Sequence, residues 1–301
     1  MNDDGRDDPR DDPRGLLLGI AAFAWWGATP LFWKLLGDTP AAVLLAHRIT
    51  WATPVFLAAA VLVGQGPAIR AALSDRRHVG WMLASAAMVA TNWLVYLIAV
   101  MSGRVLHASL GYFLNPLLST LLGALVLGER LHVSQWVAVG LAFLGVLWLG
   151  LWLGEIPWIG LVLAGSFGLY GLLRKQAPVP GLAGSAVEVL FLVPLSGAAV
   201  VWLVAEQGLP DPITGLLLLS SGVVTAVPLI LFAASVRRIR LSTTGILQYV
   251  APSLQFLLAV LVFGEAFTLA VHLPAFVLIW SGVGVYLVRT WRSHGTKGGA
   301  K

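Results

Sequence analysis

Residues 107–129 read HASLGYFLNPLLSTLLGALVLGE, and residues 243–265 read TTGILQYVAPSLQFLLAVLVFGE. Aligned at an offset of 136 positions, the two stretches share a proline in mid-segment, an apolar run after it, and a final Gly-Glu. Pro116 falls on Pro252 in this alignment. A chain that carries one apolar segment twice, in the same order of landmarks, contains an internal repeat.

The composition places most of the chain in a lipid bilayer. Hydrophobic residues make up 58% of the 301 residues and charged residues only 11%, whereas a soluble domain carries roughly a quarter charged residues. A soluble fold could not cover this much apolar surface. The chain has no cysteine, which excludes disulfides, thiolate metal sites and cysteine nucleophiles. Because the basic residues fall between the apolar spans, the net charge of +5 does not indicate a nucleic-acid partner.

Ten apolar segments are long enough to cross a bilayer, which takes roughly 20 residues per helix. These predicted spans are 16–36, 40–63, 79–101, 106–127, 133–151, 156–175, 182–204, 213–235, 242–263 and 269–290. Most connections are very short, so consecutive helices should form antiparallel hairpins. Residues 1–14 are acidic and lack apolar periodicity, which predicts a disordered cytoplasmic tail. Residues 291–301 are expected to form a second cytoplasmic tail.

The basic residues predict the orientation of the chain in the membrane. If the amino terminus is cytoplasmic, 16 of the 19 Lys and Arg residues fall on the cytoplasmic side and two on the outer side. Arg48 lies inside a span. Since cytoplasmic loops carry the excess of Lys and Arg, both termini are predicted to be cytoplasmic.

The repeat extends beyond the two quoted stretches to their neighbours. Arg48 matches Glu188 at an offset of 140, for example. The repeating unit is therefore five helices, residues 15–151 and again residues 156–290. Because five is odd, the second unit enters the membrane from the opposite side. Inverted repeats of this kind are a recurrent plan of secondary transporters, with the substrate site near the midplane between the halves. The predicted fold class is thus all-α integral membrane, with ten transmembrane helices as two inverted five-helix repeats.

Six short motifs run along the chain: HRITW at 47–51, NW at 92–93, ASLGYFLNPL at 108–117, GER at 128–130, YGLLRK at 170–175 and RLSTTGILQY at 240–249. Together they resemble the EamA-type transporters of the drug/metabolite transporter superfamily, with the RarD-like subfamily as the nearest likeness. The resemblance covers about residues 15–290. It implies a ten-helix carrier of the bacterial inner membrane, built from two EamA repeats, and it does not identify the cargo.

Polar side chains recur at helical spacing along both copies of the repeated segment. They share one face in each copy: Tyr112, Asn115, Pro116 and Ser119 in the first, and Gln248, Pro252 and Gln255 in the second. Lipid offers such groups no partner, so they should face either a cavity or another helix. Each proline removes a backbone donor and bends its helix, as a hinge or as a static kink. Further candidate cavity residues are Trp26, Asn92, Tyr96, Thr225 and Tyr249.

Three ionisable residues lie well inside the spans: His47, Arg48 and Glu188. A charge at the bilayer centre costs roughly 2.5–3.5 kcal/mol, and such residues usually have partners and a function. Arg48 or His47 is expected to bind substrate or balance charge, and Glu188 is a candidate proton-coupling carboxylate. Arg48 and Glu188 could pair across the interface between the repeats, but their depths in the spans leave that contact open.

Two further carboxylates, Glu129 and Glu265, follow the glycine at the end of each repeated segment. A carboxylate at the carboxyl end of a helix interacts unfavourably with the helix dipole. These residues are therefore expected to hold tight turns through hydrogen bonds to the next helix.

The sequence predicts a secondary transporter that works by alternating access on a small organic metabolite or drug, with export favoured. Aromatic walls with a few polar anchors suit such a cargo. Uptake or exchange of an amino acid or related carboxylate remains the alternative, since Arg48 could bind a carboxylate. An intramembrane enzyme is a remote alternative, because no metal-ligand motif or clustered acids lie in the spans, and no cofactor or metal is expected. The expected partners are the small-molecule substrate and membrane lipid. Protons are the candidate coupling ion, with substrate exchange as the alternative, and no oligomeric state is predicted.

Overall fold

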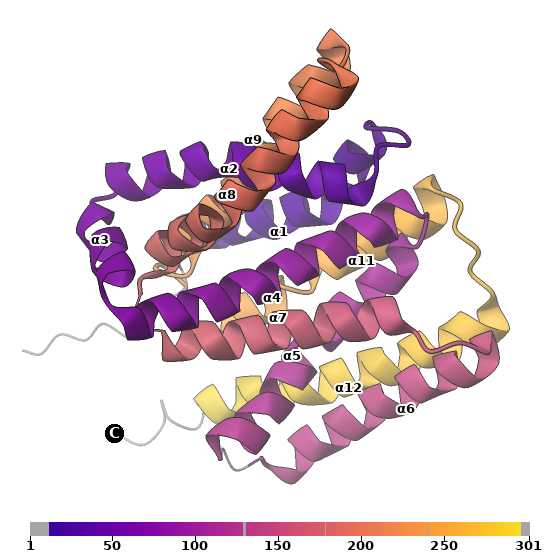
Figure 1. Cartoon of the computed structure of the whole chain (residues 1–301). Coiled ribbons are helices and arrows are strands. Elements are labelled where there is room, and N and C mark those ends of the chain that lie inside the picture. The colour runs from indigo at the N-terminus through magenta and orange to yellow at the C-terminus, as the bar shows by residue number, and fades with distance from the viewer. Residues whose placement is uncertain (1–11, 129–130, 178, 240, 296–301) are drawn as a thin grey trace, which may run out of the picture.

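The computed structural model describes residues 12–128, 131–177, 179–239 and 241–295. Within these ranges the chain forms helices and no strands, which confirms the predicted all-α class (Figure 1). In chain order the helices are α1 (Pro13–Lys34), α2 (Ala41–Leu62), α3 (Gly66–Ser74), α4 (Arg76–Met101), α5 (Val105–Leu127), α6 (Val133–Leu153), α7 (Trp158–Gln176), α8 (Gly181–Gln207), α9 (Pro212–Ser235), α10 (Leu241–Leu247), α11 (Val250–Leu257), the π-helix η1 (Leu258–Val262) and α12 (Leu269–Gly295).

Nine helical segments in the described part of the chain are long and apolar enough to cross a membrane, and one of them, Thr243–Val262, runs through α10, α11 and η1. They coincide with nine of the ten predicted spans. The remaining predicted span, 156–175, forms α7, which is not among the nine and whose last turn carries Arg174 and Lys175. Helix α7 packs against α4 and α5. The number of ten spans therefore stays a prediction.

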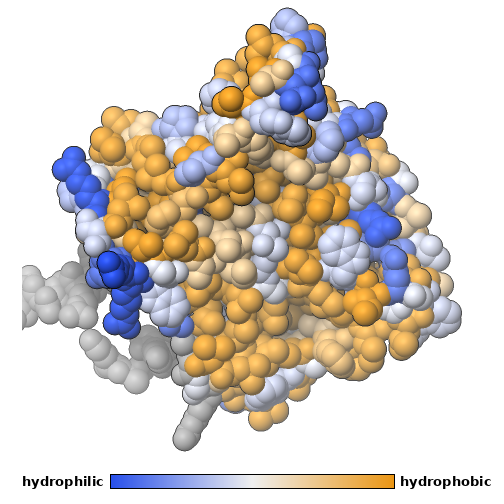
Figure 2. Space-filling model, viewed as in Figure 1, coloured by the Kyte–Doolittle hydropathy of each residue, from blue (hydrophilic) through white to orange (hydrophobic). Residues whose placement is uncertain are grey.

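Large apolar side chains cover the outside of the bundle. Leu125, Leu151 and Leu195 are 69%, 73% and 80% exposed, for example. Figure 2 shows a broad apolar face over the middle of the helices, with hydrophilic residues gathered toward the helix ends. A bundle that presents its apolar side chains outward in this way is suited to a lipid environment.

The contacts between helices come in matched sets when α1, α2, α4, α5 and α6 are taken as one unit and α7 to α12 as the other. Helix α1 packs on α9 and α11, as α7 packs on α4 and α5. Helix α2 contacts α9, as α8 contacts α4. Three more contacts join a helix to its own counterpart: α2 with α8, α5 with α11, and α6 with α12. Exchange of two units about a two-fold axis leaves this pattern unchanged, which supports the predicted division into residues 15–151 and 156–290.

Glycine allows two of these crossings to bring backbones close together. Gly222 of α9 lies against the backbone of Trp51 and Ala52 in α2. Gly111 of α5 faces Gly160 of α7 so closely that a Cβ at Gly111 would lie 2.8 Å from the Gly160 Cα. Small residues at crossings are the usual means by which membrane helices pack.

The glycines of the two Gly-Glu endings have the same backbone conformation. Gly128 and Gly264 have φ angles of 68° and 64°, the left-handed conformation in which glycine commonly ends a helix. The repeat seen in the sequence is thus also a repeat of the backbone at these turns.

The sequence analysis expected Glu265 to form hydrogen bonds to the next helix, but its described hydrogen bonds go to α5 instead. Its Oε1 accepts a hydrogen bond from the N–H of Val105 at 2.7 Å, and its Oε2 accepts one from the N–H of Leu106 at 2.8 Å. These residues begin α5, so Glu265 caps a helix of the other unit and joins the two units at that end of the bundle. The equivalent residue, Glu129, lies outside the described residues.

The predicted span 242–263 is not one continuous helix. It is divided into α10, α11 and η1, with a break at Gln248 and Tyr249. Because Pro252 has no N–H, the carbonyl of Gln248 lacks its usual helical donor, which favours the break. Helix α5, the counterpart, continues unbroken through Pro116.

The connection between α2 and α4 contains a short helix, α3, that was not predicted. It packs against α4 and α8, and beside it the side-chain oxygen of Gln65 accepts a hydrogen bond from the N–H of Ala183 at 2.8 Å. At the chain ends, α1 begins at Pro13 and α12 continues to Gly295. Small parts of both predicted tails are therefore helical.

Candidate functional site

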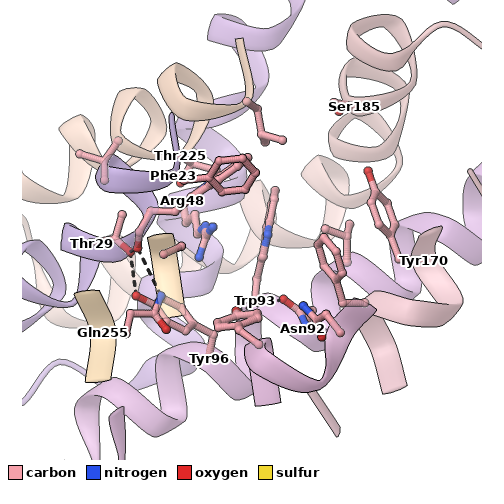
Figure 3. Close-up of a pocket in the computed structure, with 18 of the residues that line it drawn as sticks. Phe23, Thr29, Arg48, Asn92, Trp93, Tyr96, Tyr170, Ser185, Thr225 and Gln255 are labelled. Carbon is pink, nitrogen blue, oxygen red and sulfur yellow. Dashed lines mark hydrogen bonds between the residues drawn. The ribbon is translucent and has the colours of Figure 1, made fainter. Parts of the chain in front are cut away.

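A cavity of about 160 Å³ lies between the two units. Its lining comes from α1, α2, α4 and α5 of the first unit and from α7, α8, α9 and α11 of the second. Figure 3 shows labelled side chains from both units pointing into one space. A cavity of about 150 Å³ holds a benzene molecule, so this space suits a small organic molecule.

The structure brings nine of the twelve predicted cavity residues into this lining: Trp26, Arg48, Asn92, Tyr96, Tyr112, Asn115, Thr225, Gln248 and Gln255. The coupling candidate Glu188 and the hinge candidate Pro252 also line it. Residues from seven of the predicted spans thus converge, although they are up to 229 positions apart in sequence.

Four predicted residues lie outside the lining: His47, Ser119, Tyr249 and Pro116. The Nδ1 of His47 instead accepts a hydrogen bond from Trp51 Nε1 at 3.1 Å, and Tyr249 stacks on Phe113 with ring centroids 6.1 Å apart. Successive residues of a helix point about 100° apart, and here Arg48 faces the cavity while His47 faces away from it. Ser119 is exposed, one turn beyond the last α5 residue that lines the cavity.

The lining residues repeat as the sequence does. Seven pairs are equivalent at offsets of 144, 140 or 136: Phe23 and Phe167, Trp26 and Tyr170, Arg48 and Glu188, Val89 and Thr225, Trp93 and Leu229, Tyr112 and Gln248, and Asn115 and Ala251. Both units therefore contribute the same positions to the cavity, with different side chains at most of them.

Arg48 lies between two aromatic rings at one part of the cavity. Its Cζ is 4.3 Å from the ring centroid of Trp93 and 5.3 Å from that of Trp33 (Figure 3). The side chain is 7% exposed, and its Nε and Nη1 are buried without a hydrogen-bond partner among the described residues. Aromatic faces stabilise a cation electrostatically but leave its N–H donors unused.

Glu188 lies in a different polar cluster, which contains Ser85, Tyr170 and Arg174. Its Oε1 accepts a hydrogen bond from the Ser85 hydroxyl at 2.7 Å and lies 3.7 Å from Arg174 Nη1. Its Oε2 accepts one from the Tyr170 hydroxyl at 3.3 Å. Arg174 Nη2 also donates to the carbonyl of Gly181 at 3.1 Å. Glu188 is therefore paired with Arg174 rather than with Arg48.

Hydrogen bonds hold several of the remaining polar groups. The hydroxyls of Thr29 and Tyr96 lie 2.7 Å apart, and Gln255 Nε2 donates to the carbonyl of Trp26 at 3.3 Å. Asn92 Nδ2 donates to the carbonyl of α7 residue Leu163 at 3.0 Å. Figure 3 shows Thr29, Tyr96 and Gln255 together at one wall.

The sequence analysis did not include several residues that the structure brings to the site: Phe23, Thr29, Trp93, Phe167, Tyr170, Ser185 and Arg174. The repeat contained a signal for one of them, since Tyr170 is equivalent to the predicted residue Trp26. Arg174 follows Tyr170 by one helical turn, so both side chains lie on one face of α7. No group of His, Cys, Asp and Glu residues in the described ranges is arranged to hold a metal ion.

Comparison with known proteins identifies the family. Residues 13–151 match the EamA-like transporter family. Over 283 residues the chain is 43% identical to protein RarD of Streptomyces exfoliatus, covering 92% of this chain and 88% of that protein. It is 42% identical over 287 residues to an uncharacterized transporter of Pseudomonas aeruginosa, covering 93% and 95% of the two chains. The chain belongs to the EamA-like transporter family.

Within the EamA-like transporter family, the chain groups with the RarD-like proteins, as its motifs indicated. One solved structure, titled as a crystal structure of a protein, superposes with a TM-score of 0.59 at 24% identity. It covers 92% of this chain and 98% of the other. This likeness shows that the fold is shared. As an EamA-like transporter with many apolar helices, the protein is a bacterial multi-pass membrane protein of the drug/metabolite transporter group.

Proposed function

We propose that this EamA-like protein is a secondary transporter of the bacterial inner membrane that exports a small organic metabolite or drug by alternating access. The observation that carries the proposal is the cavity between the two units, lined at equivalent positions by both of them. Two units that can exchange conformations would open this space to one side of the membrane and then to the other.

The orientation follows from the distribution of basic residues. With 16 Lys and Arg residues on one side and two on the other, both termini are cytoplasmic. Under this orientation, Glu188 and Arg174 lie toward the cytoplasmic ends of α8 and α7, and Arg48 lies nearer the middle of the bundle. The cavity would thus extend from mid-membrane toward the cytoplasm, the side from which an exporter takes its cargo.

Proton coupling through Glu188 is part of the same proposal. The carboxylate lines the cavity, and the groups that face it are Arg174, Tyr170 and Ser85. Protonation of Glu188 would remove its charge from Arg174 and release the pair, which links proton binding to the packing of α7 on α8. Exchange without protons is the alternative.

Reconstituted vesicles test this function. The purified protein is placed in proteoliposomes loaded with an unlabelled metabolite panel, and counterflow of each labelled compound is measured with and without a pH gradient. We expect saturable counterflow of at least one organic compound. The pH gradient should stimulate this counterflow in the unmodified protein and should have no effect on it in Glu188→Gln. Absence of counterflow for the whole panel would refute the transport proposal, whereas gradient stimulation that persists in Glu188→Gln would refute only the coupling role.

A further inference from the structure

The two charged side chains that line the cavity differ in the partners that surround them. Among the described lining residues, Arg48 and Glu188 are the charged side chains. Glu188 has Arg174 at 3.7 Å and two hydroxyl donors. Arg48 has no ion pair with any described carboxylate, and its Nε and Nη1 have no acceptor. The cavity therefore contains one cation that no described carboxylate neutralises.

An unpaired cation in this position costs free energy. A polar group buried without a hydrogen bond is destabilising, and a buried charge without a partner is more so. The rings of Trp33 and Trp93 offset part of the cost by holding the guanidinium between them. They leave the Nε and Nη1 of Arg48 without an acceptor among the described residues. Arginine presents these donors in a fixed fork that matches a carboxylate.

The neighbouring groups also favour an anion. The Nε1 of Trp33 is another buried donor without a partner in the described part of the chain, on the same ring that contacts Arg48. The remaining walls near Arg48 are largely aromatic and include Tyr96 and Tyr112. Both tyrosines are neutral donors or acceptors at ordinary pH, so neither supplies the missing negative charge.

From this arrangement we propose that the cargo is a monoanionic organic acid with a flat apolar body, and that its carboxylate binds the guanidinium of Arg48 beside Trp33 and Trp93. The inference rests on the proposed transport function and names the substrate class for the same cavity. A neutral or cationic cargo leaves Arg48 unpaired, and a dianion brings a charge for which the lining has no second free cation in the described residues. A monoanion alone balances the site.

Binding measured on the purified protein in lipid nanodiscs tests the substrate class without a transport assay. The probes are three acids and their isosteric amides: phenylacetate and phenylacetamide, indole-3-acetate and indole-3-acetamide, and hexanoate and hexanamide. Binding is followed by quenching of tryptophan fluorescence for the non-indole pairs and by thermal stabilisation for all pairs. We expect at least one acid to bind tenfold or more tightly than its amide. If no acid binds more tightly than its amide, the proposal is wrong.

Variants locate the anion site. In Arg48→Gln the preference for the acid should disappear, and in Arg48→Lys it should persist at reduced strength because the charge remains without the planar fork. Arg104→Gln is the matched control, since Arg104 is an exposed residue directly before α5 and its only described ion pair is at 3.9 Å. A preference that survives in folded Arg48→Gln contradicts the assignment. If that variant does not fold, the acid and amide comparison in the unmodified protein still decides.

The outcomes separate this inference from the transport proposal. Tight binding of an acid through Arg48, combined with no counterflow in vesicles, would retain the anion site and reject the transport function. Counterflow of neutral compounds, with no preference for acids, would retain the transport function and reject the anion site.

Discussion

Glu188 pairs with Arg174 on the neighbouring helix, with the carboxylate Oε1 and the guanidinium Nη1 3.7 Å apart and both side chains largely buried. Its repeat equivalent, Arg48, is not its partner. Removing one member of a buried ion pair leaves the other charge uncompensated, which costs roughly 3–5 kcal/mol. The pair thus connects α7 to α8 beside the cavity and should be measurable as a coupling energy.

A double-mutant cycle measures this coupling. Glu188→Gln and Arg174→Gln should each lower the free energy of unfolding in detergent micelles, and the double variant should lose less than the sum. We expect a coupling energy of roughly 1–3 kcal/mol, the range found for residues in direct contact. The exposed pair Arg104 and Glu155, at 3.9 Å, is the control and should give less than about 1 kcal/mol. Strict additivity for Glu188 and Arg174 would show that the contact contributes nothing.

Gly184 offers a second test of the same pair. A Cβ at this position would overlap the guanidinium of Arg174. Because the guanidinium ends a flexible side chain, Gly184→Ala should displace Arg174 from Glu188 while the helices stay packed. Repeating the cycle in the Gly184→Ala background should reduce the coupling to less than about 0.5 kcal/mol. Gly181→Ala is the control, since a Cβ there meets nothing within 4 Å; an undiminished coupling in Gly184→Ala would contradict the geometry.

Glu265 should make stability depend on pH. Burial raises the pKa of its carboxyl above the ordinary value of 4.5, although hydrogen bonds from Leu106 and Val105 oppose the shift. The folded protein therefore holds more protons than the unfolded chain in the window above pH 4.5, and its stability falls as the pH rises through that window. Glu265→Gln should remove this decline and weaken the cap on α5 by roughly 0.5–2 kcal/mol. Unfolding measured across this range checks both effects.

Asp211 provides a control of opposite sign for the Glu265 experiment. Hydrogen bonds from Thr214, and from the N–H of Ile213, hold the pKa of Asp211 below its ordinary value of 3.8. Its contribution to stability is present above that value and is lost on acidification. Asp211→Asn should therefore flatten the acid side of the profile only. Equal pH slopes in the unmodified protein and Glu265→Gln would refute the raised pKa of Glu265, and equal stability of the two proteins would refute its capping role.

Gly222 tests the crossing of α2 and α9. A methyl group at this position would collide with the backbone of Trp51, which cannot move aside as a side chain can. Gly222→Ala should destabilise the protein by roughly 1–3 kcal/mol, the cost of overpacking. Gly140→Ala in α6 is the control, because a Cβ there meets nothing within 4 Å, and it should be neutral or slightly stabilising. Thermal unfolding in one detergent compares the two; equal melting temperatures would contradict the crossing.

The inverted arrangement can be tested by labelling, because the chain has no native cysteine. His132→Cys and Ala266→Cys place single thiols just after the two Gly-Glu endings, at exposed positions. If the two units are inverted, a membrane-impermeant maleimide added to spheroplasts should label Ala266→Cys, on the outer side of the membrane. It should not label His132→Cys, on the cytoplasmic side. Ser102→Cys and Ser74→Cys are the outer and cytoplasmic controls. Labelling of both test positions from one side would end the inverted-repeat proposal.

Much of the helical layout could be predicted from the sequence, because a bilayer demands long apolar helices and leaves few other solutions. The face of α5 that carries Tyr112 and Asn115 also followed from helical spacing. Spacing, however, states which residues share a face and not how far a cavity extends along it, so Ser119 was assigned to the cavity although it is exposed.

The pairing of charges could not be predicted, because it depends on which helices meet. Arg174 lies near a helix end, where the sequence analysis counted it among the basic residues of the cytoplasmic loops. The repeat made Arg48 and Glu188 equivalent and therefore suggested a pair. Equivalent positions across a two-fold axis need not be in contact, and here each faces a different part of the cavity.

The repeated segment occurs in two backbone forms, continuous in α5 and interrupted at Gln248 and Tyr249. The molecule consequently contains a template for its own second conformer. In a second conformer the two segments would exchange backbones. Residues 105–127 would then be interrupted at Tyr112 and Phe113, and residues 241–263 would form a continuous helix. Interspin distances measured across the bundle in the two conformers would then differ by amounts that can be calculated in advance from the structure of one conformer.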